Sequence, residues 1–159
     1  MLDVRIVCVG KLKEQYWRDA CAEYSKRLGA YCKFSITEVD EYRLGDSPSP
    51  AQIAQCLQSE GREILSKCPS GARLIAMCIE GKEQSSEKLS ETMSELAMSG
   101  GAVCFIIGGS FGLSDEVKSK AKIKLSMSPM TFPHQLARVM LCEQIYRTFC
   151  INNGSKYHK

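Results

Sequence analysis

Apolar runs with a high β-propensity alternate along this chain with segments whose apolar residues recur at helical spacing. The first run, Leu2 to Val9, is rich in β-branched residues and ends at Gly10. From Glu14 to Leu28 the apolar residues fall on one helical stripe, formed by Tyr16, Trp17, Ala20, Cys21, Tyr24 and Leu28. Period-2 or continuous apolar runs are typical of strands, and a 3.6-residue stripe is typical of a helix. The pattern predicts a strand followed by a helix that stops at Gly29.

The same alternation continues to the C-terminus. Further strands are predicted at Lys33 to Val39, Arg73 to Ile79, Ala102 to Ile107 and Ile123 to Met127. Helices are predicted from about Ala51 to Lys67, after the capping residues Ser85 and Ser114, and with Pro133 in the first turn. The polar segment Asp40 to Pro50 is predicted to be a loop. This order predicts an α/β fold, a mostly parallel sheet flanked by helices.

Length and composition limit the class of protein. A chain of 159 residues with 44% hydrophobic and 25% charged residues fits one domain, residues 1–159. No run of 18 or more apolar residues occurs, and Asp3 and Arg5 interrupt the first apolar stretch. We therefore expect neither a membrane span nor a secretory signal, and a cytoplasmic protein.

Nine cysteines are spread along the chain without a Cys-x-x-Cys pair. A disulfide framework favours an even number of cysteines in a small secreted chain, and structural zinc sites favour closely spaced pairs. The sequence therefore favours free, buried thiols that act as small hydrophobic residues, and no metal is expected.

The positive charge is concentrated near the C-terminus. Residues 117–159 hold eight lysines and arginines against the single acid Glu143, although the whole chain has a net charge of only +3. Such an asymmetry indicates a polyanionic partner such as nucleic acid. The run Lys118 to Lys124 is equally consistent with a solvated helix face.

A ligand site is expected where the parallel strands end, because ligands of open α/β sheets bind beyond the carboxyl ends of the strands. Three segments occupy that position: Met77 to Lys82, Gly108 to Gly112 and Met127 to Phe132. Glycines let a flat group such as adenine lie against the main chain. The alternative is that Gly108 and Gly109 only form a turn.

The residues around the glycine turn argue against a phosphorylated ligand. Neither GxGxxG nor GxxxxGK[ST] occurs, and Asp115 and Glu116 occupy the first turn of the next helix, where they would repel phosphate. S-adenosyl-L-methionine has no phosphate and carries a cationic sulfonium, and methionine-rich walls suit its thioether-like body. The alternative for each single methionine is core packing.

Several motifs in this order resemble the small SPOUT-class methyltransferases that modify N3 of a pseudouridine in large-subunit (23S) ribosomal RNA. The motifs are VGKLKEQYW (Val9 to Trp17), AEYSKRL (Ala22 to Leu28), IEGK (Ile79 to Lys82), FIIGGSFGL (Phe105 to Leu113), LSMSPMTFPHQLARVMLCEQIYR (Leu125 to Arg147) and YHK (Tyr157 to Lys159). The resemblance runs from end to end, and the departures from it are the Asp40 to Pro50 loop, which has no match, and the extra cysteines.

The resemblance implies a C-terminal trefoil knot whose loops hold S-adenosyl-L-methionine as methyl donor. It implies the cofactor-binding residues Met77, Gly108, Met127, Ser128, Pro129, Met130, Thr131 and Phe132. It further implies a homodimer that packs through the last helix, with the C-terminal tail near the partner's cofactor. Candidates for that contact, or alternatively for the core of the chain itself, are Leu136, Val139, Met140 and Ile145.

Methylation of N3 requires the nitrogen to be held near the methyl group and its proton to be removed. The candidate catalytic residues are His158 and Tyr157 in a flexible tail, and His134 and Arg138 at the start of the last helix. A histidine at a helix start is often structural, and Arg138 is expected either to bind RNA phosphate or to stabilise an enolate-like oxygen. We expect RNA recognition by shape and ribosomal context, with the ribosome or large subunit as substrate.

Two alternatives from other functional classes remain open at this point. One is an α/β enzyme that binds a nucleotide cofactor, which the missing phosphate motif argues against. The other is a non-catalytic ribosome-binding factor of the same fold, which the intact GGSFG, MTFPH and YHK segments argue against.

Overall fold

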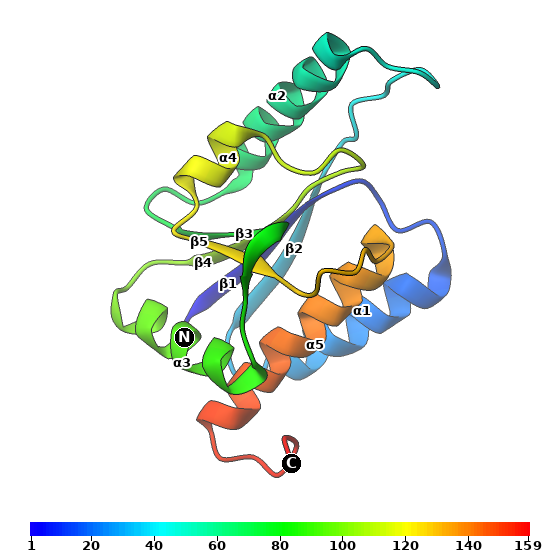
Figure 1. The fold of residues 1–159 in the computed structure, drawn as a ribbon. Coiled ribbons are helices and arrows are strands. Elements are labelled where there is room, and N and C mark those ends of the chain that lie inside the picture. Colours follow the sequence, from blue (N-terminus) through cyan, green and yellow to red (C-terminus); the bar gives the residue numbers. More distant parts are fainter.

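A five-stranded sheet forms the centre of the protein, for which a computed structural model describes all residues 1–159 (Figure 1). The strands are β1 (Asp3–Val9), β2 (Lys33–Val39), β3 (Arg73–Glu83), β4 (Val103–Ile107) and β5 (Ile123–Ser126). Their order across the sheet is β2-β1-β4-β3-β5, and every neighbouring pair is parallel. The predicted α/β fold with a mostly parallel sheet is confirmed.

Helices cover both faces of the sheet. One face carries α1 (Gln15–Leu28), α3 (Ser86–Met98) and α5 (His134–Asn152), and the other carries α2 (Pro50–Lys67) and α4 (Asp115–Lys120) (Figure 1). Two apolar clusters fill the spaces between the sheet and these layers. Neighbouring residues of β4 point to opposite clusters, Phe105 to the first and Ile106 to the second, which explains why this central strand is continuously apolar.

Serine side chains cap three of the helices. Ser85 and Ser114 accept hydrogen bonds from the N–H groups of Lys88 and Val117, as predicted. Ser49 and Gln52 form a capping box at the start of α2. Pro133 directly precedes α5 instead of lying in its first turn, because its backbone has the extended ψ of an N-cap residue.

Strand β3 is longer than predicted. Beyond Ile79 it continues to Glu83 after an irregularity, and Lys82 and Glu83 pair with Leu125 and Ser126 of β5. The extension could not be predicted from the polar residues after Ile79, since their side chains are largely exposed and do not alternate between buried and exposed positions. Gly81 makes the pairing possible, because a Cβ atom there would lie 2.7 Å from the carbonyl carbon of Leu125.

Three predictions about side-chain placement have different outcomes. Tyr16 leaves the predicted apolar stripe of α1, since it is 63% exposed. Ile145 is fully buried in the core, so it is no candidate for a contact between subunits. Seven of the nine cysteines are buried, and none forms a disulfide. No helix is both long enough and apolar enough to cross a membrane.

We predict that Gly81→Ala lowers the free energy of unfolding by about 1–3 kcal/mol, because the added methyl group forces β3 away from β5. Urea unfolding measures the change. The matched control is Gly45→Ala, whose Cβ atom meets nothing within 4 Å and whose φ is not positive. Equal stability of the two variants would contradict the close packing of β3 on β5.

Candidate active site

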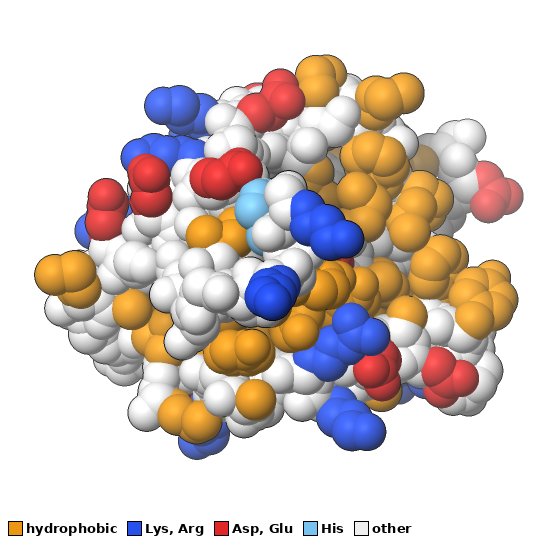
Figure 2. All heavy atoms as spheres, turned by 90° about the horizontal axis from the view of Figure 1, so that it is seen from below, with side chains coloured by type: hydrophobic (Ala, Val, Ile, Leu, Met, Phe, Trp, Pro, Cys, Tyr) orange, Lys and Arg blue, Asp and Glu red, His pale blue; other side chains and the backbone are white.

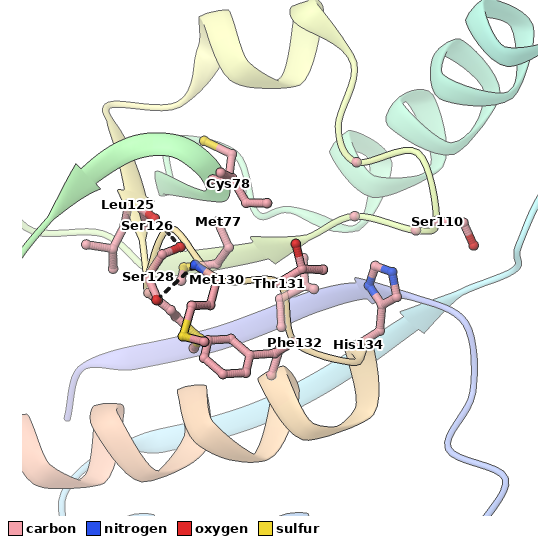
Figure 3. A pocket seen from close by; sticks show the side chains of 17 residues that line it. Met77, Cys78, Ser110, Leu125, Ser126, Ser128, Met130, Thr131, Phe132 and His134 are labelled. Atoms are coloured by element: carbon pink, nitrogen blue, oxygen red, sulfur yellow. Dashed lines mark hydrogen bonds between the residues drawn. The ribbon is translucent and has the colours of Figure 1, made fainter.

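A cavity of about 250 Å³ lies at the carboxyl edge of the sheet, where the middle of β3 meets the ends of β4 and β5 (Figure 3). Met77 on β3 pairs with Ile107 of β4 on one side and with Leu125 of β5 on the other. This register brings the three following segments to one level. The cavity is lined by Met77, Cys78, Ile79, Ile107, Gly108, Gly109, Ser110, Gly112, Leu125, Ser126, Met127, Ser128, Met130, Thr131, Phe132, His134 and Ala137.

The glycine turn after β4 forms one wall from bare backbone. The Gly112 N–H donates to the Gly109 carbonyl over 3.0 Å, and the two residues form an isolated bridge. A Cβ atom on Gly108 would lie 2.3 Å from the Gly112 carbonyl oxygen, and Gly112 has a φ of +83°. Both positions therefore require glycine, and the turn offers main-chain groups to a ligand.

The loop after β5 forms the opposite wall and is held by its own serines. The Ser126 hydroxyl donates to the Ser128 carbonyl over 3.1 Å, and the Ser128 hydroxyl accepts from the Met130 N–H over 3.0 Å (Figure 3). Of the predicted cofactor residues, the structure brings together Met77, Gly108, Met127, Ser128, Met130, Thr131 and Phe132. Pro129 does not line the cavity.

Sequence reasoning named too few residues on the three segments. Ile79, Ser110 and Ser126 also line the cavity, and none was among the predicted cofactor residues. Ile79 and Ser110 fall within the predicted segments Met77 to Lys82 and Gly108 to Gly112, so including every residue of those segments would have found them. Ser126 lies within β5, where alternation predicts only the face of a side chain and not its access to a cavity.

The cavity walls carry no arginine or lysine, and this absence bears on the charge of the ligand that the cavity can hold. Cys78 and His134 are the only lining residues with an ionisable side chain, and burial raises the pKa of the Cys78 thiol. Asp115 and Glu116 occupy the first turn of α4, as predicted. A phosphorylated ligand would therefore meet no cationic side chain in these walls, whereas an uncharged or cationic ligand needs none.

A buried carboxyl supports the glycine turn from behind. Glu60 of α2 is 4% exposed, accepts the Tyr42 N–H over 2.9 Å, and its Oε1 would lie 3.0 Å from a Cβ atom on Gly109. Burial raises the pKa of Glu60, although the hydrogen bonds from Tyr42 and Cys56 act to lower that pKa. The contact joins the loop after β2 to the turn that walls the cavity.

Arg138 is a fixed part of the fold one turn into α5. Its side chain is buried, and its guanidinium donates to the Glu38 carboxylate over 2.7 Å and to the Gly10 carbonyl over 3.1 Å. These bonds tie α5 to the ends of β1 and β2. Because these bonds engage the guanidinium, Arg138 is not free to contact RNA phosphate as predicted. His134, in contrast, is exposed and lines the cavity.

The C-terminal tail is docked instead of flexible. The Tyr157 hydroxyl donates to Glu143 over 2.8 Å, and the His158 ring bonds Glu87 over 2.8 Å and Arg147 over 3.1 Å. Burial acts to raise the pKa of Glu143, but hydrogen bonds from tyrosines and Arg147 outweigh it and lower that pKa. The tail lies at the end of α5 opposite to His134, so it is remote from the cavity of its own chain (Figure 1).

Comparison with known proteins decides the family. A family model described as "Predicted SPOUT methyltransferase" matches residues 2–158. The chain belongs to the SPOUT methyltransferase family.

Relatives of known name extend over the whole chain. A protein of Clostridioides difficile (strain 630) and one of Bacillus pumilus (strain SAFR-032) are each 48% identical over 159 residues, which cover 99% of this chain and all of the relative. Both are named "Ribosomal RNA large subunit methyltransferase H".

Solved structures support the fold. A probable methylase family protein from Haemophilus influenzae Rd KW20 superposes with a TM-score of 0.58 at 16% identity, over 100% of this chain and 72% of that one. A putative methylase family protein from Neisseria gonorrhoeae gives a TM-score of 0.52 at 16% identity, over 91% of this chain and 82% of that one. The trefoil knot expected of the SPOUT family stays a prediction.

We predict that Arg138→Ala lowers the free energy of unfolding by about 1–3 kcal/mol, since it leaves the partly buried Gly10 carbonyl without its donor and Glu38 without its partner. Chemical denaturation measures the loss. In a Glu38→Gln background, Arg138→Ala should lower the free energy of unfolding by less, because the charge pair between Arg138 and Glu38 is already lost. An additive double variant would show that the Arg138–Glu38 pair contributes nothing of its own.

Proposed function

We propose that this protein transfers a methyl group from S-adenosyl-L-methionine to N3 of a pseudouridine in large-subunit (23S) ribosomal RNA. The observation that carries the proposal is an apolar cavity with a bare glycine wall and no lysine or arginine, in a chain of the SPOUT methyltransferase family. Full-length relatives named as large-subunit ribosomal RNA methyltransferases support the RNA substrate.

The residues present fit the methyl donor. The Gly108–Gly112 turn is folded so tightly that a Cβ atom on Gly108 would collide with the Gly112 carbonyl, and it offers backbone groups to an adenine edge, while Met77, Met127 and Met130 provide a soft apolar surface. When bound, S-adenosyl-L-methionine supplies an electrophilic methyl group. The chain would hold the cofactor between the two walls, exclude water with its apolar lining, and leave the target nitrogen one direction of approach.

The tail residues Tyr157 and His158 remain the proposed catalytic pair, and their position favours action on a second subunit. They lie at the far end of α5 from their own cavity, so they can act only at the cavity of a partner in a homodimer. There, the imidazole is the candidate acceptor of the N3 proton, and the phenol is the candidate group that orients it. His134, which lines the cavity, is the alternative acceptor from the same chain.

The helix layer that carries α5 has the composition of a subunit interface. Viewed from this side, hydrophobic side chains extend from the centre of the view to its right edge, with basic groups among them (Figure 2). Leu136, Val139 and Met140 are only half-buried, and Val139 and Met140 line a groove of about 520 Å³ between α3 and α5. A second copy that covers this groove would bury them.

Substrate and location follow from the proposed activity. A ribosomal RNA methyltransferase acts where ribosomes are made and used, which places its action in the cytoplasm. The intact large subunit or ribosome is the proposed substrate, because the chain offers a shaped edge instead of a separate RNA-binding module.

Mass spectrometry of 23S ribosomal RNA from cells with and without this gene tests the proposal. We expect one methylated pseudouridine to be present only when the gene is intact. An unchanged methylation pattern, together with binding of the protein to ribosomes, would instead support a non-catalytic ribosome-binding factor. Binding of NAD or ATP in place of S-adenosyl-L-methionine would support an enzyme that uses a nucleotide cofactor.

We predict that Gly108→Ala weakens binding of S-adenosyl-L-methionine at least about tenfold, because the methyl group collides with the Gly112 carbonyl and deforms the wall. Isothermal titration calorimetry on the folded variant measures the affinity. Gly45→Ala serves as control, since it makes the same change in open space. An unchanged affinity for Gly108→Ala would exclude the glycine turn from the cofactor site.

We predict that His158→Ala lowers kcat at least about tenfold while the Kd for S-adenosyl-L-methionine stays within about twofold. Mixing this variant with Gly108→Ala should restore about a quarter of the wild-type rate, because half of the dimers are mixed and each has one complete site. A mixture that stays inactive would contradict action of the tail on the partner subunit.

A further inference from the structure

Exposed apolar side chains concentrate at the carboxyl edge of the sheet. Six large hydrophobic residues are exposed, and two of them, Met1 and Met98, lie at the start of the chain and at the end of α3. The other four are Tyr16 at the start of α1, Ile79 in the second half of β3, Phe111 in the glycine turn and Met130 in the loop after β5. Such an uneven distribution indicates that a partner covers this edge.

Two of these four residues are aromatic rings outside the cofactor cavity. Ile79 and Met130 line the cavity, whereas Tyr16 at the start of α1 and Phe111 in the glycine turn do not. Tyr16 is 63% exposed and Phe111 is 44% exposed. The Tyr16 ring is supported edge-on by Trp17, with the ring centroids 4.9 Å apart. A supported, exposed aromatic ring is a platform on which a nucleobase can stack.

Unpaired cations lie beside the first of these rings. Lys11 and Lys13, in the loop between β1 and α1, are both exposed, and neither forms an ion pair. Arg18 donates to the carbonyl groups of Leu12 and Lys13 over 2.7 Å each, so the loop backbone is held in place. The loop therefore presents two positive charges on an ordered support, with Glu14 as the only acid within it.

This loop adjoins the walls of the cofactor cavity. The Gly10 carbonyl accepts from Arg138 of α5, and the Val9 side chain would lie 3.1 Å from a Cβ atom on Gly109. The cations are thus anchored between the glycine turn and the start of α5. A polymer bound to them would lie beside the glycine turn that also walls the cavity.

Other charged segments are less suited to a polyanion. In the run Lys118 to Lys124, Lys118 pairs with Glu80 and Lys120 pairs with Glu116. The loop after β2 carries Asp40, Glu41 and Asp46 against the single cation Arg43. The concentration of charge that the sequence placed in the C-terminal third is therefore partly neutralised, although Lys122 and Lys124, like Lys11 and Lys13, form no ion pair.

We propose that a docking rim formed by Lys11, Lys13, Tyr16 and Phe111 binds the single-stranded RNA that flanks the target nucleotide. Lys11 and Lys13 contact phosphates, and the two rings stack bases on either side of the nucleotide that enters the cavity. Single-stranded segments are the RNA elements whose bases are open to such stacking. This inference rests on the proposed function and specifies the surface by which the same site receives its substrate.

Steady-state kinetics on large ribosomal subunits tests the docking rim. For the double variant Lys11→Ala/Lys13→Ala and for Tyr16→Ala, we expect the KM for the subunit to rise about tenfold, while kcat, the Kd for S-adenosyl-L-methionine and Tm stay near wild type. The lysine double variant should also show a KM that depends less on salt, because fewer counterions are released.

Two matched variants separate docking from general effects. Lys26→Ala/Lys33→Ala removes the same charge from exposed lysines at the opposite edge of the sheet and should leave KM unchanged. Tyr16→Phe keeps the ring and should restore the wild-type KM. A rise of KM in the control pair equal to that in the rim pair would overturn the proposal, because charge at either edge would then serve equally well.

The outcome is also distinguishable from failure of the proposed function. If the wild-type protein methylates no RNA, the proposed function fails, and binding of a fluorescent single-stranded oligoribonucleotide to wild type and rim variants still tests the rim. Equal affinities in that assay overturn the docking rim. Dissociation of a dimer by Tyr16→Ala in light scattering also overturns it, since the edge would then be an interface between copies of this chain.

Discussion

The register of β3 between β4 and β5 is the constraint on which the site depends. Met77 pairs with Ile107 on one side and with Leu125 on the other, so the middle of β3 lies at the level where β4 and β5 end. The walls then follow from local chemistry: glycines that permit close backbone contacts after β4, and a serine-pinned loop after β5. A shift of one residue in this pairing would turn Met77 away from the cavity.

Much of the fold could be predicted because its signals are local. The continuous apolar strands, the serine caps and the alternation of elements are each encoded within a few residues, and all ten predicted elements are present. The end of β3 could not be predicted, because its last residues are exposed and pair only through a backbone contact at Gly81. Such pairing leaves no hydrophobic pattern.

The candidate site was predictable as a location but less so in its details. The rule that ligands bind where parallel strands end named three segments that line the cavity, since it depends only on the order of elements. It could not show that Pro129 lies outside the cavity lining, that Arg138 is engaged with Glu38, or that the tail is docked on Glu143 and Glu87. Those facts depend on long-range contacts between side chains, which no sequence spacing reveals.

The two ends of α5 have different parts in the proposed activity. The start of the helix lies at the cofactor cavity and is anchored by Arg138, whereas its end carries the tail with Tyr157 and His158. One rigid helix thus separates methyl-donor binding from the proposed catalytic groups, and pairing of two chains would bring them together. The exposed rim beside the cavity is the proposed entry for RNA.

A crystal structure of the protein with S-adenosyl-L-methionine tests the central claim most directly. The account predicts that the adenine lies against the backbone of the Gly108–Gly112 turn, with the methionine portion between that turn and the Met127–Phe132 loop. A cofactor bound elsewhere, or a cavity that takes up a dinucleotide in its place, would contradict it.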